Sequence, residues 1–191
     1  MLEKYRTLRE SGLAVFDRKA TANLLGISYA STNPVLDRLL KAGILRRIKR
    51  DRYVLAEAAS GQTRKIANEL VKPSAISLWT ALSDAGATTQ VPRVVQSVTP
   101  MRSMLIEPKG LPSFEYVHLP PRLFFGNELR DDVWIARPEK ALLDLLYVQR
   151  GVCDWESMDI RSFKARVLRR YARVFPPRIQ RALSEAFPTL G

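Results

Sequence analysis

Basic side chains crowd one short stretch of the chain, ILRRIKRDRYVL, which spans residues 44–55. Five of its twelve residues are basic, and apolar residues recur between them. The five cations are Arg46, Arg47, Lys49, Arg50 and Arg52. Cations at this density neutralise phosphate oxygens, so nucleic acid is the first class of ligand that the sequence indicates.

A second set of candidate contact residues, Ser31, Thr32 and Asn33, lies just upstream. If they form the first turn of a helix in the major groove, they face base edges, and Asn can make a bidentate contact with adenine. For Ser31, a role as a plain N-cap is an equally good interpretation. Arg38, one turn further on, and the five cations above are expected to bind the phosphate backbone.

The helix that carries these residues is placed by its proline and its glycine. Pro34 is tolerated in the first turn of a helix, so we expect the helix to begin near Ser31 rather than at Ser28. Gly43 is expected to end it. Its apolar stripe consists of Val35, Leu36, Leu39 and Leu40.

Further elements complete a small N-terminal module. Residues 1–10 read as a helix, and a second helix is expected between Asp17 as N-cap and Gly26 as terminator. This second helix and the one at Ser31 form a helix-turn-helix pattern, and the two halves of the basic stretch predict a hairpin. The residues expected to hold the hairpin on the helices are Ile44, Ile48, Tyr53 and Leu55. The module is therefore predicted to be a winged helix-turn-helix, with a merely solvated hairpin as the alternative.

The bulk composition bounds the class of protein. The chain has 191 residues, of which 46% are hydrophobic, and a formal net charge of +12. A single cysteine, Cys153, excludes an internal disulfide. The first residues lack the apolar core of a signal peptide, and no segment approaches the roughly 18 apolar residues of a spanning helix. We therefore expect a soluble cytoplasmic protein with no membrane partner.

The charge is concentrated at the two ends of the chain. Residues 1–56 hold 12 basic and 5 acidic side chains, residues 57–160 hold 11 and 13, and residues 161–191 hold 8 and 1. Both ends thus carry a net charge of +7 around a nearly neutral middle. One binding surface is not expected to explain both ends.

The rest of the chain predicts a second, α+β domain. Residues 57–63 (EAASGQT) are small and polar and suggest a linker between a domain at 1–56 and a domain at 64–191. In the second domain, β-prone runs punctuated by prolines predict a small mixed sheet with packed helices. The predicted strands lie at 93–99, 103–107 and 114–119, and the predicted helices at 64–71, 75–86, 137–151, 160–175 and 177–187.

Several segments together resemble the AbiEi antitoxin family of the AbiE abortive-infection, type IV toxin–antitoxin systems. They are PSAISLWTALSDAG, QVPRVVQSVTP, FEYVHLPPRLFFG and VWIARPEKALLDLLY, and the resemblance covers nearly the whole chain. Its most specific piece is Pro138-Glu139-Lys140-Ala141-Leu142-Leu143-Asp144, with Phe124-Phe125-Gly126 upstream. Arg137 departs from the small hydroxyl residue expected as the N-cap there, which should weaken the cap without changing the fold.

The resemblance implies a dual role in phage defence. The N-terminal domain would bind inverted repeats of double-stranded operator DNA and repress its own operon, and a dimer on the DNA would fit such repeats. The C-terminal domain would counter a nucleotidyltransferase-like toxin, with or without direct contact. The alternative is a winged-helix RNA-binding or protein-interaction module without operon repression.

Two segments of the C-terminal region raise separate questions. The segment 161–181 carries eight basic residues and no acid, which suggests an acidic partner, RNA or additional DNA; a simple solvated helix is an equally good interpretation. The residues expected to bind the partner are Arg166, Arg169, Arg170 and Arg173. In the other segment, PEKALLD, Glu139 and Lys140 are expected to cap and flank a core helix rather than form a site.

Enzymatic chemistry finds little support. The chain has one histidine, His118, and one cysteine, too few for a His- or Cys-rich metal site. Nothing in the sequence orients His118 and Cys153 as a nucleophilic pair. Phosphate-binding glycine loops are missing from the sequence. We therefore expect no catalytic residues, metal or cofactor.

Overall fold

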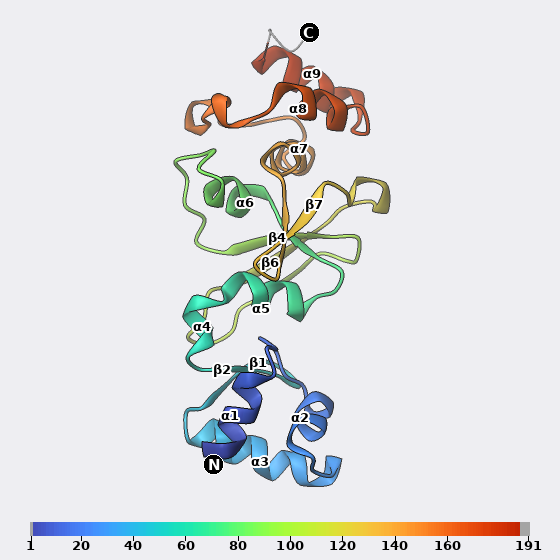
Figure 1. Cartoon of the computed structure of the whole chain (residues 1–191). Coiled ribbons are helices and arrows are strands. Elements are labelled where there is room, and N and C mark those ends of the chain that lie inside the picture. Colours follow the sequence, from blue (N-terminus) through green and yellow to red (C-terminus); the bar gives the residue numbers. More distant parts are fainter. Residues whose placement is uncertain (1, 188–191) are drawn as a thin grey trace.

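The structure is a computed structural model that describes residues 2–187. The elements follow one another along one long direction, with α1 and α3 at one end and α9 at the other (Figure 1). Two sheets lie between these ends, one with two strands and one with six. The fold is α+β, as predicted.

The N-terminal part contains three helices and the smaller sheet. The elements are α1 (Leu2–Glu10), α2 (Arg18–Leu25), α3 (Tyr29–Lys41), β1 (Leu45–Lys49) and β2 (Arg52–Leu55). Asp17 caps α2 by accepting a hydrogen bond from the Ala20 N–H, and Gly26 ends α2 in the left-handed region at φ 60°. β1 and β2 pair antiparallel. The predicted caps of α2 and the predicted hairpin are therefore confirmed.

The predicted start of α3 is wrong. The helix begins at Tyr29, because the Ser28 side chain accepts a hydrogen bond from the Ser31 N–H at 3.2 Å. Pro34 consequently lies in the second turn, where a missing hydrogen bond and a steric clash cost about 3 kcal/mol. Burial of Val35 and Leu36, worth roughly 1.5–3 kcal/mol each, offsets that cost.

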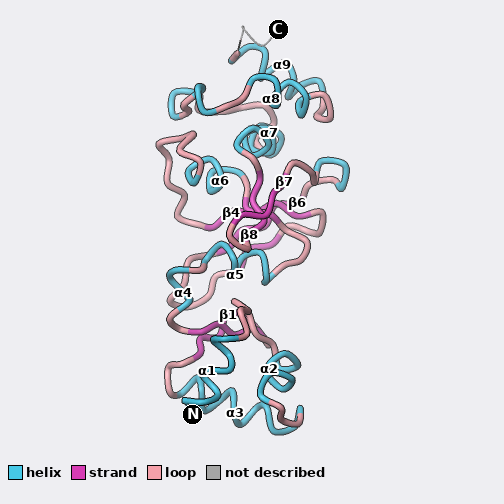
Figure 2. Tube along the Cα trace, in the orientation of Figure 1, coloured by secondary structure: helices cyan, strands magenta, loops and turns pink. Residues whose placement is uncertain are grey.

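The rest of the described chain surrounds a six-stranded sheet of order β5-β6-β4-β3-β8-β7. The strands are β3 (Ala75–Ile76), β4 (Val95–Thr99), β5 (Met104–Ile106), β6 (Phe114–His118), β7 (Asn127–Arg130) and β8 (Val133–Ala136). The α-helices are α4 (Ala58–Gly61), α5 (Thr63–Leu70), α6 (Leu78–Asp84), α7 (Pro138–Val148), α8 (Ala165–Ala172) and α9 (Pro177–Ala186). The 3-10 helices are η1 (Pro121–Leu123), η2 (Trp155–Ser157) and η3 (Ile160–Ser162). Figure 2 shows α5 on one side of the sheet and α6 and α7 on the other.

Several sequence-based boundaries need correction. The expected linker, residues 57–63, contains the one-turn helix α4. Ala75 and Ile76 extend the sheet as β3, so α6 begins only at Leu78. The helix expected from residue 160 begins at Ala165. The hairpin β7–β8 was not predicted, because NELR and VWIA are short and the first is mostly polar.

Apolar side chains from both faces of the small hairpin are buried, which ties the two parts together. Tyr53 belongs to the apolar core of the N-terminal helices, whereas Ile48 and Val54 belong to the core that contains α5 and the large sheet. The Glu69 carboxylate accepts hydrogen bonds from the N–H groups of Ala14 and Val15, at 2.9 and 2.8 Å. Ile48 was expected to pack on the helices and instead faces the second core. The residues around 57–63 therefore do not separate two independent cores.

Candidate functional site

The clearest open surface of the N-terminal part is one face of α3. This helix lies at the end of the molecule opposite α9 (Figure 1). Tyr29 is 54% exposed there, and Asn33 and Asp37, one and two turns further on, are exposed as well. Arg38 is also exposed, and its Nε donates to the Pro34 carbonyl at 3.1 Å. The face thus presents aromatic, amide and charged groups to solvent.

The structure divides the three residues expected to face base edges. Asn33 and Ser31 are exposed, but Ser31 also takes part in the cap, with its hydroxyl 2.8 Å from that of Ser28. Thr32 is fully buried, and its hydroxyl donates to the Ser28 carbonyl at 3.0 Å. The expectation that Thr32 faces the groove is wrong, because Thr32 lies three residues before Val35 and four before Leu36 and therefore on the same buried face of α3.

Arg18 links the α3 face to the tip of the hairpin. Its Nη1 donates to Asn33 Oδ1 at 3.4 Å, and its guanidinium carbon lies 4.9 Å from the centre of the Tyr29 ring. Its Nε lies 3.4 Å from Asp51 Oδ1, in the turn between β1 and β2. The sequence reasoning missed Arg18, although its place directly after the cap residue Asp17 puts it at the start of α2.

All five hairpin cations were expected to bind phosphates, but two of them make contacts within the protein. Arg46 Nη1 donates to the Gly110 carbonyl at 2.9 Å. Arg52 Nη1 lies 3.6 Å from the Asp17 carboxylate and donates to the Asp51 carbonyl at 2.8 Å. Arg46 is exposed and Arg52 is partly buried, and both make contacts that hold the hairpin in place.

Three hairpin cations remain near the tip, namely Arg47, Lys49 and Arg50. Arg47 and Arg50 are exposed, while Lys49 is partly buried. Arg47 Nε donates to the Lys49 carbonyl at 3.4 Å. Partial burial lowers the pKa of Lys49, and the neighbouring Arg52 adds to the effect. None of the three forms an ion pair within the described residues.

A second basic surface lies on α8, at the other end of the chain. The side chains of Arg166, Arg169, Arg170 and Arg173 are exposed, while Leu168 between them is fully buried. The four arginines line one shallow hollow together with Val167. No acidic side chain of the described residues lines that hollow. The structure thus brings the four predicted residues together on one face.

The PEKALLD segment has a different role from the one expected. Lys140 and Asp144 form an ion pair inside the core, and both side chains are completely buried. Ser77 Oγ donates to Asp144 Oδ2 at 2.8 Å, and Lys140 Nζ lies 5.1 Å from the centre of the Phe125 ring. Burial lowers the pKa of Lys140, and the Asp144 carboxylate counters this. The expectation that Lys140 flanks a core helix is wrong, because its ammonium group is buried between Asp144 and the rings of Phe125 and Phe175.

The segment Phe124-Phe125-Gly126 packs directly on this buried pair. Gly126 has a φ of +69°, and a Cβ atom there would lie 3.2 Å from Lys140 Cγ and 3.1 Å from the Tyr171 ring. Glu139 accepts a hydrogen bond from the Lys164 N–H at 2.9 Å and so fixes the chain before α8. The two most specific segments of the sequence therefore form one packed unit.

The N-terminus of α7 lacks a side-chain cap. Arg137 occupies the N-cap position and makes no capping hydrogen bond; its Nε instead lies 2.9 Å from Glu128 Oε2. The missing capping hydrogen bond agrees with the weakened N-cap that was expected from Arg137.

Cys153 and His118 are the other reactive side chains that the sequence singled out. Burial raises the pKa of the Cys153 thiol to about 11, and Asp154 adds to the effect, so little thiolate forms at neutral pH. His118 Nδ1 lies 2.6 Å from the Met101 carbonyl oxygen. Among residues 2–187 there is no group of three or more His, Cys, Asp or Glu side chains that could hold a metal ion. Within the same residues, no helix is long and apolar enough to cross a membrane.

Comparison with known proteins shows a likeness in fold but none in sequence. No protein-family model matches the sequence, and no curated protein sequence does either. The fold is similar to the crystal structure of the Rv2827c protein from Mycobacterium tuberculosis, with a TM-score of 0.65 and 12% sequence identity. The match covers 98% of this chain and 75% of the other. At this identity the likeness shows a shared fold and nothing about function.

Proposed function

We propose that the chain is an antitoxin that binds double-stranded DNA and represses its own operon. In this proposal the N-terminal part is a winged helix-turn-helix, with α2 and α3 as the helix pair and β1–β2 as the wing. The proposal rests on one observation above all: Arg18 joins the exposed face of α3 to the tip of the hairpin. Helix-turn-helix proteins place such a helix in the major groove.

Each exposed group then has a distinct role on the DNA. Asn33 reads adenine through its amide, and Arg18, which contacts Asn33, limits the positions that the amide adopts. Arg38, Arg47 and Arg50 bind phosphates, which supplies affinity but not sequence choice. Lys49 adds a weaker contribution, because it is partly buried beside Arg52.

The C-terminal part carries the antitoxin activity in this proposal. Its support is the resemblance of the PEKALLD and Phe124-Phe125-Gly126 segments to the AbiEi antitoxins, together with their packing as one unit. The partner is a nucleotidyltransferase-like toxin, and the four arginines of α8 form the surface that meets it. Operon repression would involve two copies of the chain on inverted repeats.

DNA binding is tested by titrating the full chain into a labelled fragment of its own promoter, with scrambled DNA of equal length as competitor. The proposal expects preferential binding to the promoter. Equal binding to both DNAs would contradict it. Tighter binding to a double-stranded RNA of the same sequence would favour the RNA-binding alternative.

Antitoxin activity is tested by co-expressing the chain with a nucleotidyltransferase-like toxin of the AbiE type. The expected result is restored growth, and no restoration when Arg166, Arg169, Arg170 and Arg173 are changed to Glu. The DNA affinity of the same variant provides the control, since a folded protein retains it. Full restoration by this variant would exclude the α8 surface.

A further inference from the structure

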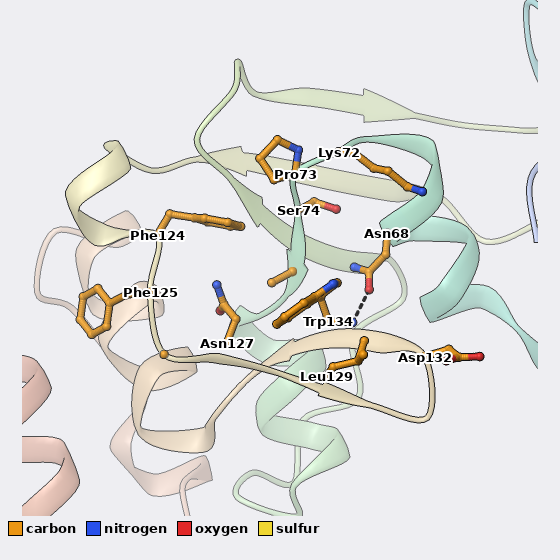
Figure 3. Close-up of a pocket in the computed structure, with 12 residues that line it drawn as sticks. Asn68, Lys72, Pro73, Ser74, Phe124, Phe125, Asn127, Leu129, Asp132 and Trp134 are labelled. Carbon is orange, nitrogen blue, oxygen red and sulfur yellow. Dashed lines mark hydrogen bonds between the residues drawn. The ribbon is translucent and has the colours of Figure 1, made fainter.

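A hollow of about 790 Å³ opens beside the β7–β8 hairpin, in the middle of the molecule. Its size is within the range of small-molecule sites, roughly 300–1,000 Å³. Figure 3 shows that Phe124 and Trp134 lie on two sides of it, with Ser74 and Asn127 around the same space. The hollow involves none of the residues assigned to DNA or toxin binding.

Three residues that line the hollow each carry a buried polar atom without a hydrogen-bond partner. Among the described residues, four buried side-chain atoms have no hydrogen-bond partner: Asn68 Nδ2, Ser74 Oγ, Ser97 Oγ and Asn127 Oδ1. Three of these four residues line the hollow. Asn68 is 6% exposed and Ser74 is 5% exposed. Because buried polar atoms in proteins are nearly always paired, with protein groups or with ordered water, the three atoms are groups whose hydrogen bonds a bound ligand can complete.

The three atoms define the hydrogen bonds that such a ligand must offer. Asn68 Oδ1 already accepts a hydrogen bond from the backbone N–H of Trp134 at 2.6 Å, which leaves Asn68 Nδ2 as a free donor. Asn127 Oδ1 is an acceptor, and the Ser74 hydroxyl can do both. The matching ligand therefore carries an acceptor and a donor close together.

The aromatic walls indicate a flat ligand. Trp134 is 48% exposed, so part of its indole is available for stacking, and the Phe124 ring stands across the opening (Figure 3). Such side chains stack on flat heteroaromatic rings, and all nucleobases can stack in this way because each has a π-face. A flat ring with a donor and an acceptor on its edge is the chemistry of a nucleobase.

The rim argues against a strongly charged ligand. Lys72 and Asp132 both line it, so the rim carries one cation and one anion. Asp132 is also 3.1 Å from Lys65 Nζ. A nucleoside triphosphate is normally held by an excess of cations or by backbone N–H groups at a helix N-terminus, and this rim provides no such excess.

We propose that this hollow binds a neutral nucleobase ligand, either a free nucleoside or an unpaired base of a single strand. The ring lies between Phe124 and Trp134, accepts from Asn68 Nδ2 and donates to Asn127 Oδ1. Ser74 completes the contact. This site is independent of DNA binding by α3.

The proposal is tested by calorimetric titration of the full chain with adenosine, guanosine, cytidine and uridine. At least one nucleoside should bind saturably at one site, and more tightly than its 5′-triphosphate. Single-stranded homopolymers of the four bases form the second arm; binding of these strands without binding of nucleosides would identify a strand as the source of the base. Absence of binding in both arms, or tighter binding of the triphosphate, would overturn the proposal.

Two serine variants provide the matched comparison. Ser74→Ala and Ser97→Ala each remove a buried hydroxyl without a partner, but only Ser74 lines the hollow. Ser74→Ala should weaken binding by about tenfold, as expected for the removal of one hydrogen bond, while Ser97→Ala leaves the affinity unchanged. Neither variant should lower the Tm of the free protein.

Trp134→Ala gives an independent check, because it removes the stacking ring from a half-exposed position. It should also weaken binding. Equal affinity of the Ser74→Ala and Ser97→Ala variants, with no effect of Trp134→Ala, would place the ligand elsewhere and contradict the assignment.

Discussion

The N-terminal module and the α8 surface carry the same net charge of +7 over residues 1–56 and 161–191, but they hold it differently. In the N-terminal module, Asp17 and Asp51 pair with Arg52 and Arg18, and an exposed amide lies within this network. On α8 the arginines have no acidic partner in their hollow among the described residues. The first arrangement fixes side-chain positions, as the proposed reading of a DNA sequence requires, whereas the second offers charge alone.

An ion pair of the N-terminal module and an ion pair of α7 also differ in burial. Arg52 and Asp17 are each 35% exposed, so their pair is largely screened by water. Lys140 and Asp144, both on α7, are completely buried. Removing one partner lowers the free energy of unfolding far more for a buried pair than for an exposed pair, because the remaining charge is left unpaired in the core.

The largest expected effect is therefore on stability. Asp144→Ala leaves Lys140 unpaired in the core and should lower the free energy of unfolding by about 3–5 kcal/mol. Arg52→Ala removes an exposed pair and should lower it by less than about 1 kcal/mol. Urea unfolding of both variants measures the difference. Equal losses of unfolding free energy in the two variants would contradict the difference in burial between the two ion pairs.

The second expected effect is on sequence preference. Asn33→Ala should reduce discrimination between promoter and random DNA by about 1–3 kcal/mol, the value of one bidentate base contact. Thr32→Ala should leave discrimination unchanged, since Thr32 is buried. Competition binding with both DNAs tests this pair of variants. If Thr32→Ala were the one that reduced discrimination, the orientation of α3 on DNA would be wrong.

A smaller effect is expected from the hairpin tip, where affinity rather than preference changes. Lys49→Ala/Arg50→Ala should weaken binding to promoter and random DNA alike. The slope of log affinity against log salt should fall by about one unit for each phosphate that the variant no longer binds. Titrations at several salt concentrations measure the slope. An unchanged slope would remove the hairpin tip from the interface.

Local signals in the sequence were sufficient for much of the fold. The caps Asp17 and Gly26 and the proline at the start of α7 act within a single turn, so their elements were predicted correctly. The start of α3 was not, because Pro34 and Ser28 gave conflicting signals and core packing decided between them. The β7–β8 hairpin depends on a turn with Asp131 and Asp132 at positive φ and on pairing with β3, which is distant in sequence.

The candidate sites show the same limit. The exposed cations of α8 could be predicted from their spacing around Leu168. The buried pair could not, because an i, i+4 Lys–Asp spacing is normally a feature of solvated helices, and only distant residues such as Phe125 enclose it. The role of Arg18 likewise depends on Asn33 and Asp51, which the fold brings to it.

The central claim, that DNA binds at α3 and the hairpin rather than at α8, is tested most directly by two charge-matched triple variants of the full chain. One changes Arg47, Lys49 and Arg50 to Glu, and the other changes Arg166, Arg169 and Arg173 to Glu. Promoter affinity is measured by fluorescence anisotropy at one salt concentration. The first variant should lose binding and the second should retain it. Equal losses, or a greater loss in the second variant, would contradict the account.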